Sequence, residues 1–158
     1  MNELSLLKFC IPCNSKCCKA GKLIGTPILS ADEAKKMPYP EKTHLQEVIS
    51  PVGEKYFVIK ERKKSNKCFF LNDDNTCRIQ NNKPLDCLCY PIKAVYSDDK
   101  IWYILDSECP ACTSLSKDFI KNAKKIALKS IKRFDKQTYS HWLENYIGWV
   151  KKNLSNMI

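Results

Sequence analysis

Cysteine is the residue type whose number and spacing point to chemistry in this chain. Ten cysteines occur in 158 residues, and they form three groups along the sequence: Cys10, Cys13, Cys17 and Cys18; Cys68, Cys77, Cys87 and Cys89; and Cys109 and Cys112. A metal ion or an iron–sulfur cluster needs several soft thiolate ligands that converge on one point, and short spacings bring such ligands together. The cysteines therefore predict one or more thiolate-ligated centres.

Disulfide bonds are the main competing explanation of so many cysteines, and the sequence disfavours them. Residues 1–10 carry an early acidic residue and no long apolar stretch, so they do not resemble a secretory signal peptide. No apolar run approaches the roughly 18–20 residues that a membrane-spanning helix needs. We therefore expect a cytoplasmic protein that does not use a membrane, and cytoplasmic thiols are kept reduced. The adjacent Cys17 and Cys18 could not pair with each other without severe strain.

The ligand types favour iron over zinc. The chain has only two histidines, and all-cysteine ligation favours an iron–sulfur cluster, with [4Fe–4S] as the first expectation. The spacing of Cys10, Cys13 and Cys17 is close to the bacterial ferredoxin run but differs from it. Zn²⁺ is the alternative, because two CxxC pairs, Cys10–Cys13 and Cys109–Cys112, are the arrangement that zinc ribbons use.

Three further inferences concern individual cysteines, and one concerns the histidines. In an extended chain the side chains of Cys17 and Cys18 would point to opposite faces, which favours more than one metal centre. Cys89 is the first candidate for a small buried apolar residue with no ligand role. A redox-active dithiol at Cys109 and Cys112 is disfavoured, because neighbouring thiols would compete for metal. His44 and the second histidine, His141, are expected to pack or to lie at the surface.

The order of predicted elements gives a small, irregular α+β fold. Ser30 and Glu33 form a capping box that begins a short helix, which Pro38 ends, and a further helical turn is expected over 44–50. Turn-forming residues separate the strands of two hairpins. Apolar residues at three- and four-residue spacings predict two amphipathic helices at the end of the chain. The expected strands are 56–59, 68–71, 76–79, 92–96 and 101–105, and the expected C-terminal helices are 116–134 and 138–152.

These elements predict one cysteine-rich metal-binding domain over 1–158 with two β-hairpins and a C-terminal helical hairpin. Residues 1–112 form its metal-binding part and residues 113–158 the helical hairpin. The net charge is +10 with neutral cysteines, and two four-thiolate centres of about −2 each would lower it to about +6. The lysine-rich face of helix 116–134 is expected to be solvated and could meet an acidic protein partner. Nucleic acid is a weaker alternative, because no recognised nucleic-acid motif accompanies the lysines.

The cysteine pattern resembles a cysteine-cluster family described as zinc- or iron-chelating proteins. The family signature is CxxC, a short gap and CC, and it matches Cys10 to Cys18. Later family segments are matched by Cys68-Phe-Phe-Leu71, Cys77-Arg-Ile79, Lys83-Pro84-Leu-Asp-Cys87, Tyr90-Pro91 and Cys109-Pro110. Lys83 stands where the family has arginine, Gln80 stands where it has an aromatic residue, and Cys89 and Cys112 are additional.

The resemblance implies metal binding and identifies eight cysteines as ligands. These are Cys10, Cys13, Cys17, Cys18, Cys68, Cys77, Cys87 and Cys109. The cysteine block is also similar, more distantly, to that of flagellin lysine N-methylase, a longer enzyme with an iron–sulfur cluster. That likeness gives the enzyme alternative, a cluster-dependent modification of a protein side chain, although no catalytic residue can be named from the sequence.

Overall fold

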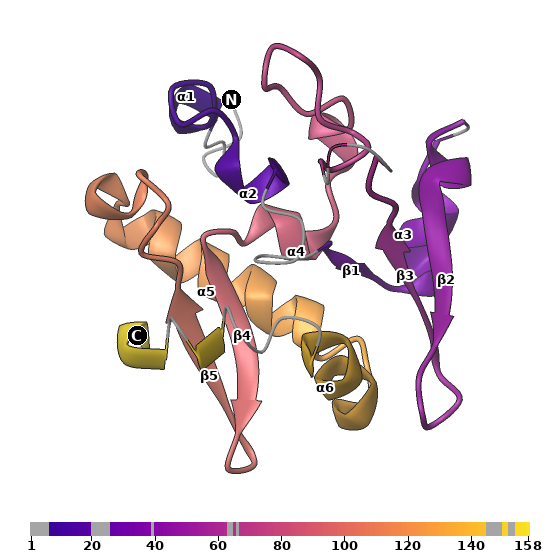
Figure 1. Cartoon of the computed structure of the whole chain (residues 1–158). Helices are drawn as coiled ribbons and strands as arrows, with labels where there is room; N and C mark the ends of the chain where they lie inside the picture. The colour runs from indigo at the N-terminus through magenta and orange to yellow at the C-terminus, as the bar shows by residue number, and fades with distance from the viewer. Residues whose placement is uncertain are drawn as a thin grey trace.

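Helices and two antiparallel sheets make up the fold, which confirms the α+β class (Figure 1). A computed structural model of the chain describes residues 7–19, 26–38, 40–62, 65, 67–144, 150–151 and 154–158. The helices in this part are α1 Leu7–Cys10, α2 Lys16–Lys19, α3 Ala31–Lys36, α4 Leu85–Leu88, α5 Lys117–Ile131 and α6 Lys136–Glu144, with 3-10 turns η2 Glu41–His44, η3 Gln80–Asn82, η4 Cys112–Ser114 and η5 Leu154–Asn156. The strands are β1 Ile28–Leu29, β2 Leu45–Ile49, β3 Lys55–Ile59, β4 Ile92–Ser97 and β5 Lys100–Leu105.

The first sheet has the order β1-β3-β2, and all of its pairs are antiparallel. The predicted capping box stands between β1 and α3, since the Ser30 hydroxyl accepts from the Glu33 N–H and the Glu33 carboxylate accepts from the Ser30 N–H. The helix stops one residue before Met37, just ahead of Pro38, as proline requires. The strand predicted over 56–59 is confirmed as β3.

The helical turn expected over 44–50 is wrong, because residues 45–49 form strand β2. This stretch is too short to be a stable helix by itself, and it ends in the β-branched pair Val48 and Ile49, which favours a strand. The neighbouring edge of β3 supplies partners along the whole length of β2, from Leu45 opposite Ile59 to Ile49 opposite Lys55. Tertiary pairing therefore decides the conformation of this segment.

The second sheet is the predicted hairpin of β4 and β5. Its register runs from Ile92 opposite Leu105 to Ser97 opposite Lys100. The two turn residues both have positive φ, 50° at Asp98 and 59° at Asp99, as a tight two-residue hairpin requires. At its other edge, β5 also meets the C-terminal end of the chain, where the Ile158 N–H donates to a β5 carbonyl at 3.0 Å.

The other predicted hairpin, 68–71 with 76–79, forms as a tight turn rather than as two strands. A single bridge joins Leu71 to Cys77, and the Arg78 N–H donates to the Phe70 carbonyl at 2.8 Å. Cys68 pairs instead with Glu61, which lies before it in the chain. The turn still brings Cys68 and Cys77 near each other, as predicted.

The two C-terminal helices are confirmed in order and type. Helix α5 begins at the cap Ser116, whose hydroxyl accepts from the Phe119 N–H at 3.1 Å, and it buries the predicted apolar stripe against β4 and α4. Helix α6 starts two residues earlier than expected and is described as far as Glu144, while residues 145–149 of the predicted helix lie outside the described residues. No helix among the described residues is long and apolar enough to cross a membrane.

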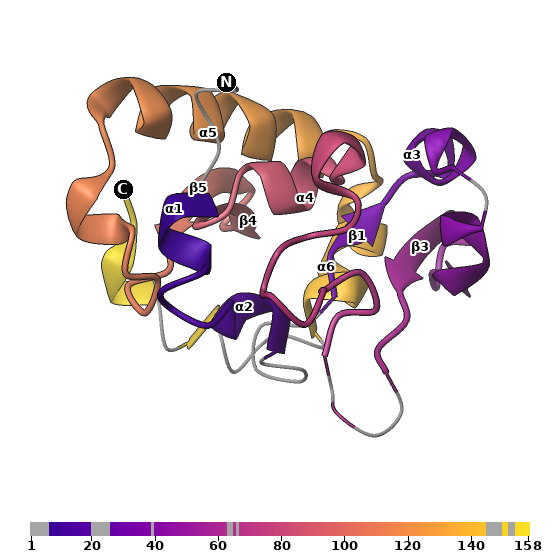
Figure 2. The same cartoon turned by 90° about the horizontal axis from the view of Figure 1, so that it is seen from above.

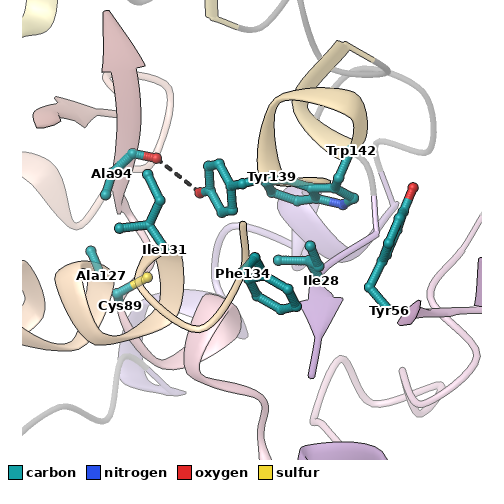
Figure 3. Close-up of a cluster of buried hydrophobic side chains, with 9 residues drawn as sticks. All are labelled: Ile28, Tyr56, Cys89, Ala94, Ala127, Ile131, Phe134, Tyr139 and Trp142. Atoms are coloured by element: carbon teal, nitrogen blue, oxygen red, sulfur yellow. Dashed lines mark hydrogen bonds between the residues drawn. The ribbon is translucent and has the colours of Figure 1, made fainter. Parts of the chain in front are cut away.

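The main core lies where the two sheets, α5 and α6 meet (Figure 3). Tyr139 and Trp142 of α6 are each 1 % exposed, and the Tyr139 hydroxyl donates to the Ala94 carbonyl at 2.9 Å. The cluster takes residues from β1, β3, β4, α5, α6, the end of α4 and the loop between α5 and α6, namely Ile28, Tyr56, Cys89, Ala94, Ala127, Ile131, Phe134, Tyr139 and Trp142. This core fixes the end of α4, the helix that carries Cys87.

Candidate metal centre

The N-terminal cysteines lie on two short helical turns. Helices α1 and α2 are joined by a turn in which Asn14 and Ser15 have φ of 60° and 48°. The backbone closes on itself there, because the Ser15 N–H donates to the Cys10 carbonyl at 2.9 Å and the Cys18 N–H donates to the Ser15 carbonyl at 2.9 Å. The segment is therefore folded locally by backbone hydrogen bonds as well as by any ligand.

This segment docks on the loop that carries the second cysteine group. The Cys68 N–H donates to the Cys18 carbonyl at 2.8 Å, and the Ser15 hydroxyl donates to the Asn75 carbonyl at 2.8 Å. The Lys19 ammonium adds a bond to the Asn75 side chain at 2.6 Å. Figure 2 shows α1 and α2 lying between the loop before α4 and the loop after β5. Cysteines that are far apart in sequence thus come from two sides toward the N-terminal group.

Cys87 reaches the same region from helix α4. The first N–H of that helix, at Leu85, donates to the Glu33 carboxylate at 2.8 Å, which ties α4 to α3. Next to Cys87, the Asp86 carboxylate binds the Lys93 ammonium of β4 at 3.1 Å, and both side chains are buried. A short helix with little stability of its own is thereby anchored to two neighbouring elements.

The thiols of these segments influence one another, which shows that they are close. Burial raises the pKa of Cys68 to about 12 and that of Cys87 well above its ordinary value, and charge on Cys18 adds to both shifts. Burial also raises the pKa of Cys10 and Cys77, where charge on Cys18 again contributes. Cys18 is therefore a neighbour of thiols in its own segment, in the loop of Cys68 and Cys77, and in helix α4.

Cys109 joins this group from the loop after β5. Burial raises the pKa of Cys109 to about 12, and charges on Cys112, Asp106 and Cys13 add to the shift. Cys13 links it to the N-terminal group. The shift of Cys112 has no contribution from an N-terminal cysteine among its main causes, which are burial and Asp106.

Lys83 is a cation that acts on several of these thiols, whereas Lys19 acts on Cys18 and Arg78 on Cys77. The Lys83 ammonium opposes the effect of burial and lowers the pKa of Cys10, Cys77 and Cys87. It also acts on Cys18, whose pKa is lowered mainly by its hydrogen bond with Cys17. Lys83, which stands where the family pattern has arginine, therefore provides positive charge beside the thiols.

The expectation that Cys17 and Cys18 point to opposite faces is wrong. Both lie on helix α2, where successive side chains are about 100° apart rather than opposed. Their sulfurs share a hydrogen bond, which raises the pKa of Cys17 and lowers that of Cys18. The adjacent pair therefore gives no argument for two separate centres.

Cys89, His44 and His141 pack against other side chains, as predicted. Cys89 is 1 % exposed and lies in the main core, where its thiol donates to the Asp86 carbonyl at 3.4 Å. The ring of His44 stacks on Phe69 with centroids 3.4 Å apart, and His141 Nδ1 lies 3.2 Å from the Tyr56 hydroxyl. These three side chains are held by contacts other than the cysteine cluster.

The donor set suits a thiophilic metal, but the side chains do not enclose one as they are placed. Among the residues described between 7 and 158, no three Cys, His, Asp or Glu side chains stand close enough together to hold one ion. The described cysteines are all free thiols, and nine of them are half-buried. The chemical type and the burial of the donors fit a thiolate-ligated metal.

Sequence reasoning missed the buried polar residues that surround the thiols. Asp86 and Lys93 form a buried ion pair, and the Tyr90 hydroxyl donates to the Asp106 carboxylate at 2.6 Å. Burial raises the pKa of Tyr90, and charge on Cys17 contributes, so its ring lies near the N-terminal group. Only the placement of Asp106 directly after an apolar strand could have drawn attention to this pair.

Comparison with known proteins adds no relative. A scan against models of protein families found no match, and searches of curated proteins and of solved structures found no significant match either. The resemblance to the cysteine-cluster family therefore rests on the cysteine motifs themselves.

Proposed function

We propose that this chain is a metal-binding protein whose cysteines hold one or two thiolate-ligated centres. An iron–sulfur cluster, with [4Fe–4S] first, is the preferred occupant and Zn²⁺ is the alternative. The proposed ligands are the eight cysteines of the family pattern: Cys10, Cys13, Cys17, Cys18, Cys68, Cys77, Cys87 and Cys109.

One observation carries the proposal: the N-terminal cysteine segment docks on the loop of Cys68 and Cys77, where the Cys68 N–H donates to the Cys18 carbonyl at 2.8 Å. The pKa shifts agree with this, because charge on Cys18 acts on Cys10, Cys17 and Cys68, and similar pairs link the other proposed ligands. Cys89, which is only two residues from Cys87, is instead enclosed by the core. Cys112 is a neighbour of Cys109, so its exclusion from the proposed ligands rests on the family pattern.

Gathering so many thiolates is unfavourable unless something compensates their charge. Burial and mutual repulsion raise the pKa of most of them, so the metal-free protein keeps these thiols protonated at neutral pH. A bound metal supplies positive charge, and its binding releases the thiol protons. Lys83 offsets only part of the repulsion. The grouping of several protonated thiols therefore supports a site that binds a metal and releases protons as it does so.

The ligands come from four separate parts of the fold. A filled centre would join the N-terminal segment, the loop at 68–77, helix α4 and the loop after β5. Metal binding of this kind contributes directly to folding free energy. The lysine-methylase-like activity stays a prediction of the resemblance, as does an acidic protein partner.

Cys87 on helix α4 and Cys89, the residue that caps its end, provide a matched test. Cys87→Ala removes a proposed ligand, and Cys89→Ala removes a thiol of the core, so both variants lose one cysteine from the same stretch of backbone. We expect anaerobically purified Cys87→Ala to lose bound metal and Cys89→Ala to retain the wild-type metal content. Equal metal content in wild type and both variants would contradict the proposed ligand set.

A further inference from the structure

Asp106 is a buried carboxylate at the point where β5 leads into the Cys109 loop. It is 1 % exposed, and its backbone N–H donates to the Pro91 carbonyl at 2.9 Å. Its Oδ2 accepts the Tyr90 hydroxyl at 2.6 Å, and its Oδ1 accepts the Glu108 N–H at 3.0 Å. Both carboxylate oxygens are thus bound, which fixes the side chain and the start of the loop.

The backbone carbonyl of Asp106 holds both cysteines of the CxxC sequence. It accepts the Cys109 N–H at 3.1 Å and the Cys112 thiol at 2.7 Å. The Cys112 N–H donates in turn to the Cys109 carbonyl at 3.0 Å, which closes the turn. The two cysteines therefore have different roles: Cys109 is bound to this carbonyl through its backbone, and Cys112 through its sulfur.

This difference determines which sulfur is available to a metal. The 2.7 Å bond of the Cys112 thiol is much shorter than the 3.5 Å bond of the Cys13 thiol to the Cys10 carbonyl, so Cys112 must give up the stronger hydrogen bond before it can bind a metal as a thiolate. The sulfur of Cys109 makes no bond to that carbonyl: it lies beside the Cys112 sulfur and has Cys13 of the N-terminal group as a further neighbour. Residues that orient metal ligands without touching the metal are common in metal sites, and changing them typically weakens binding by about 10-fold to 100-fold.

We propose that Asp106, held by Tyr90, is a positioning residue that presents Cys109 to the metal and keeps Cys112 outside as a hydrogen-bond donor. The proposal rests on the metal-binding function proposed above and goes further by choosing between the two sulfurs. It disfavours the zinc-ribbon arrangement, in which Cys109 and Cys112 would both be ligands.

Titration of the reduced 158-residue chain with Co²⁺ tests the proposal. Co²⁺ binds thiolate sites whose natural metal is iron or zinc, and the intensity of its thiolate charge-transfer band increases with the number of sulfur ligands. We expect Cys109→Ser to lower this band, because a thiolate is lost. Cys112→Ser should keep the wild-type band and affinity, because a hydroxyl can still donate to the Asp106 carbonyl. Equal loss of the band in the two variants would overturn the proposal.

The positioning role has its own variants. Tyr90→Phe keeps the ring and removes the hydroxyl, and we expect it to weaken Co²⁺ binding about 10-fold or more without loss of the charge-transfer band at saturation. Cys112→Ala should weaken binding in the same way, with Cys112→Ser as its rescue. Tyr103→Phe, on strand β5, is the matched control and should bind as wild type does. Unchanged affinity in both Tyr90→Phe and Cys112→Ala would overturn the positioning role.

Different results would contradict the metal-binding function and the choice of Cys109 as the ligand. Wild-type protein that takes up no Co²⁺ contradicts the metal-binding function itself. Wild-type protein that binds Co²⁺, together with a Cys112→Ser variant that behaves as Cys109→Ser does, contradicts only the choice of ligand. Far-UV circular dichroism of each variant verifies that the fold is retained, and Tyr90→Phe, the mildest change, carries the test if Cys112→Ala does not fold.

Discussion

The buried ion pair of Asp86 and Lys93 joins the helix that carries Cys87 to the second sheet. The Lys93 ammonium lies 3.1 Å from the Asp86 carboxylate, and the two side chains are 8 % and 3 % exposed, respectively. The same ammonium lies 4.5 Å from the centroid of the Trp142 ring. Charges at this depth are poorly solvated, so each depends strongly on the other.

Replacing Lys93 with methionine keeps most of the volume and leaves the Asp86 carboxylate without its cation. Breaking a buried pair in this way costs about 3–5 kcal/mol. For a chain of this size each kcal/mol lowers the melting temperature by about 2–4 °C, so we expect a decrease of roughly 6–20 °C. The double variant Asp86→Leu/Lys93→Met removes both charges and should recover most of this loss, because apolar replacements of buried pairs are often neutral or stabilising.

Equilibrium unfolding in denaturant, with reduced metal-free protein, measures these effects without a contribution from metal binding. The exposed pair Lys55–Glu47 is the matched control, with a 2.9 Å separation and side chains 60 % and 45 % exposed. Lys55→Met should cost roughly 0–1 kcal/mol. A Lys93→Met variant that loses no more stability than Lys55→Met, or a double variant less stable than Lys93→Met, would refute the reasoning.

Three other predictions concern helix anchoring, the core and pH. Glu33→Ala should lower the free energy of unfolding in denaturant by about 1.5–3 kcal/mol, because the Glu33 carboxylate caps α3, binds the first N–H of α4 and pairs with an arginine after α5. Ser30→Ala should lower it by about 1 kcal/mol. Equal losses in the two variants would contradict this ranking. Trp142→Ala should cost about 3–5 kcal/mol, since the side chain is 1 % exposed in the main core, and a loss under about 1 kcal/mol would exclude a central packing role. Burial raises the pKa of Cys68 and Cys109 from 9.0 to about 12, so the unfolded chain releases these protons at lower pH than the folded one. Below pH 9.0 both cysteines are protonated in the folded and the unfolded chain, so the stability of the reduced metal-free protein should not depend on them. As the pH rises from 9.0 toward 12, the protein should lose stability. Denaturant midpoints measured across that range test this, and a constant midpoint would contradict it.

Elements with local signals were predictable from the sequence. The capping box at Ser30, the hairpin around Asp98 and Asp99, and the apolar stripe of α5 depend on neighbours within a few residues, and all three are confirmed. Strand β2 was not predictable in this way, because its conformation depends on pairing with β3. The helical conformation of Cys17 and Cys18 was not predicted for a related reason. It depends on hydrogen bonds within the preceding turn, which leave no pattern of apolar residues in the sequence.

The residues around the candidate site could not be predicted from the sequence. The cysteine motifs single out eight thiols as ligands, and that ligand set stays a prediction, whereas the burial expected of Cys89 is confirmed. Spacing alone could not show that Cys18 stands beside Cys68, which depends on the docking of the N-terminal segment. The buried pair of Tyr90 and Asp106 is also a product of the folded arrangement, because two ordinary polar residues become a fixed unit only when water is excluded.

Metal and acid-labile sulfide analysis of the anaerobically purified wild-type protein tests the central claim most directly. We expect iron and sulfide in equal amounts, four of each for every [4Fe–4S] cluster, together with the broad visible absorption of thiolate-to-iron charge transfer. Stoichiometric zinc without sulfide would support a thiolate metal centre and contradict the choice of iron. Protein that contains neither iron nor zinc, and takes up neither when its thiols are reduced, would contradict the proposal that these cysteines form a metal site.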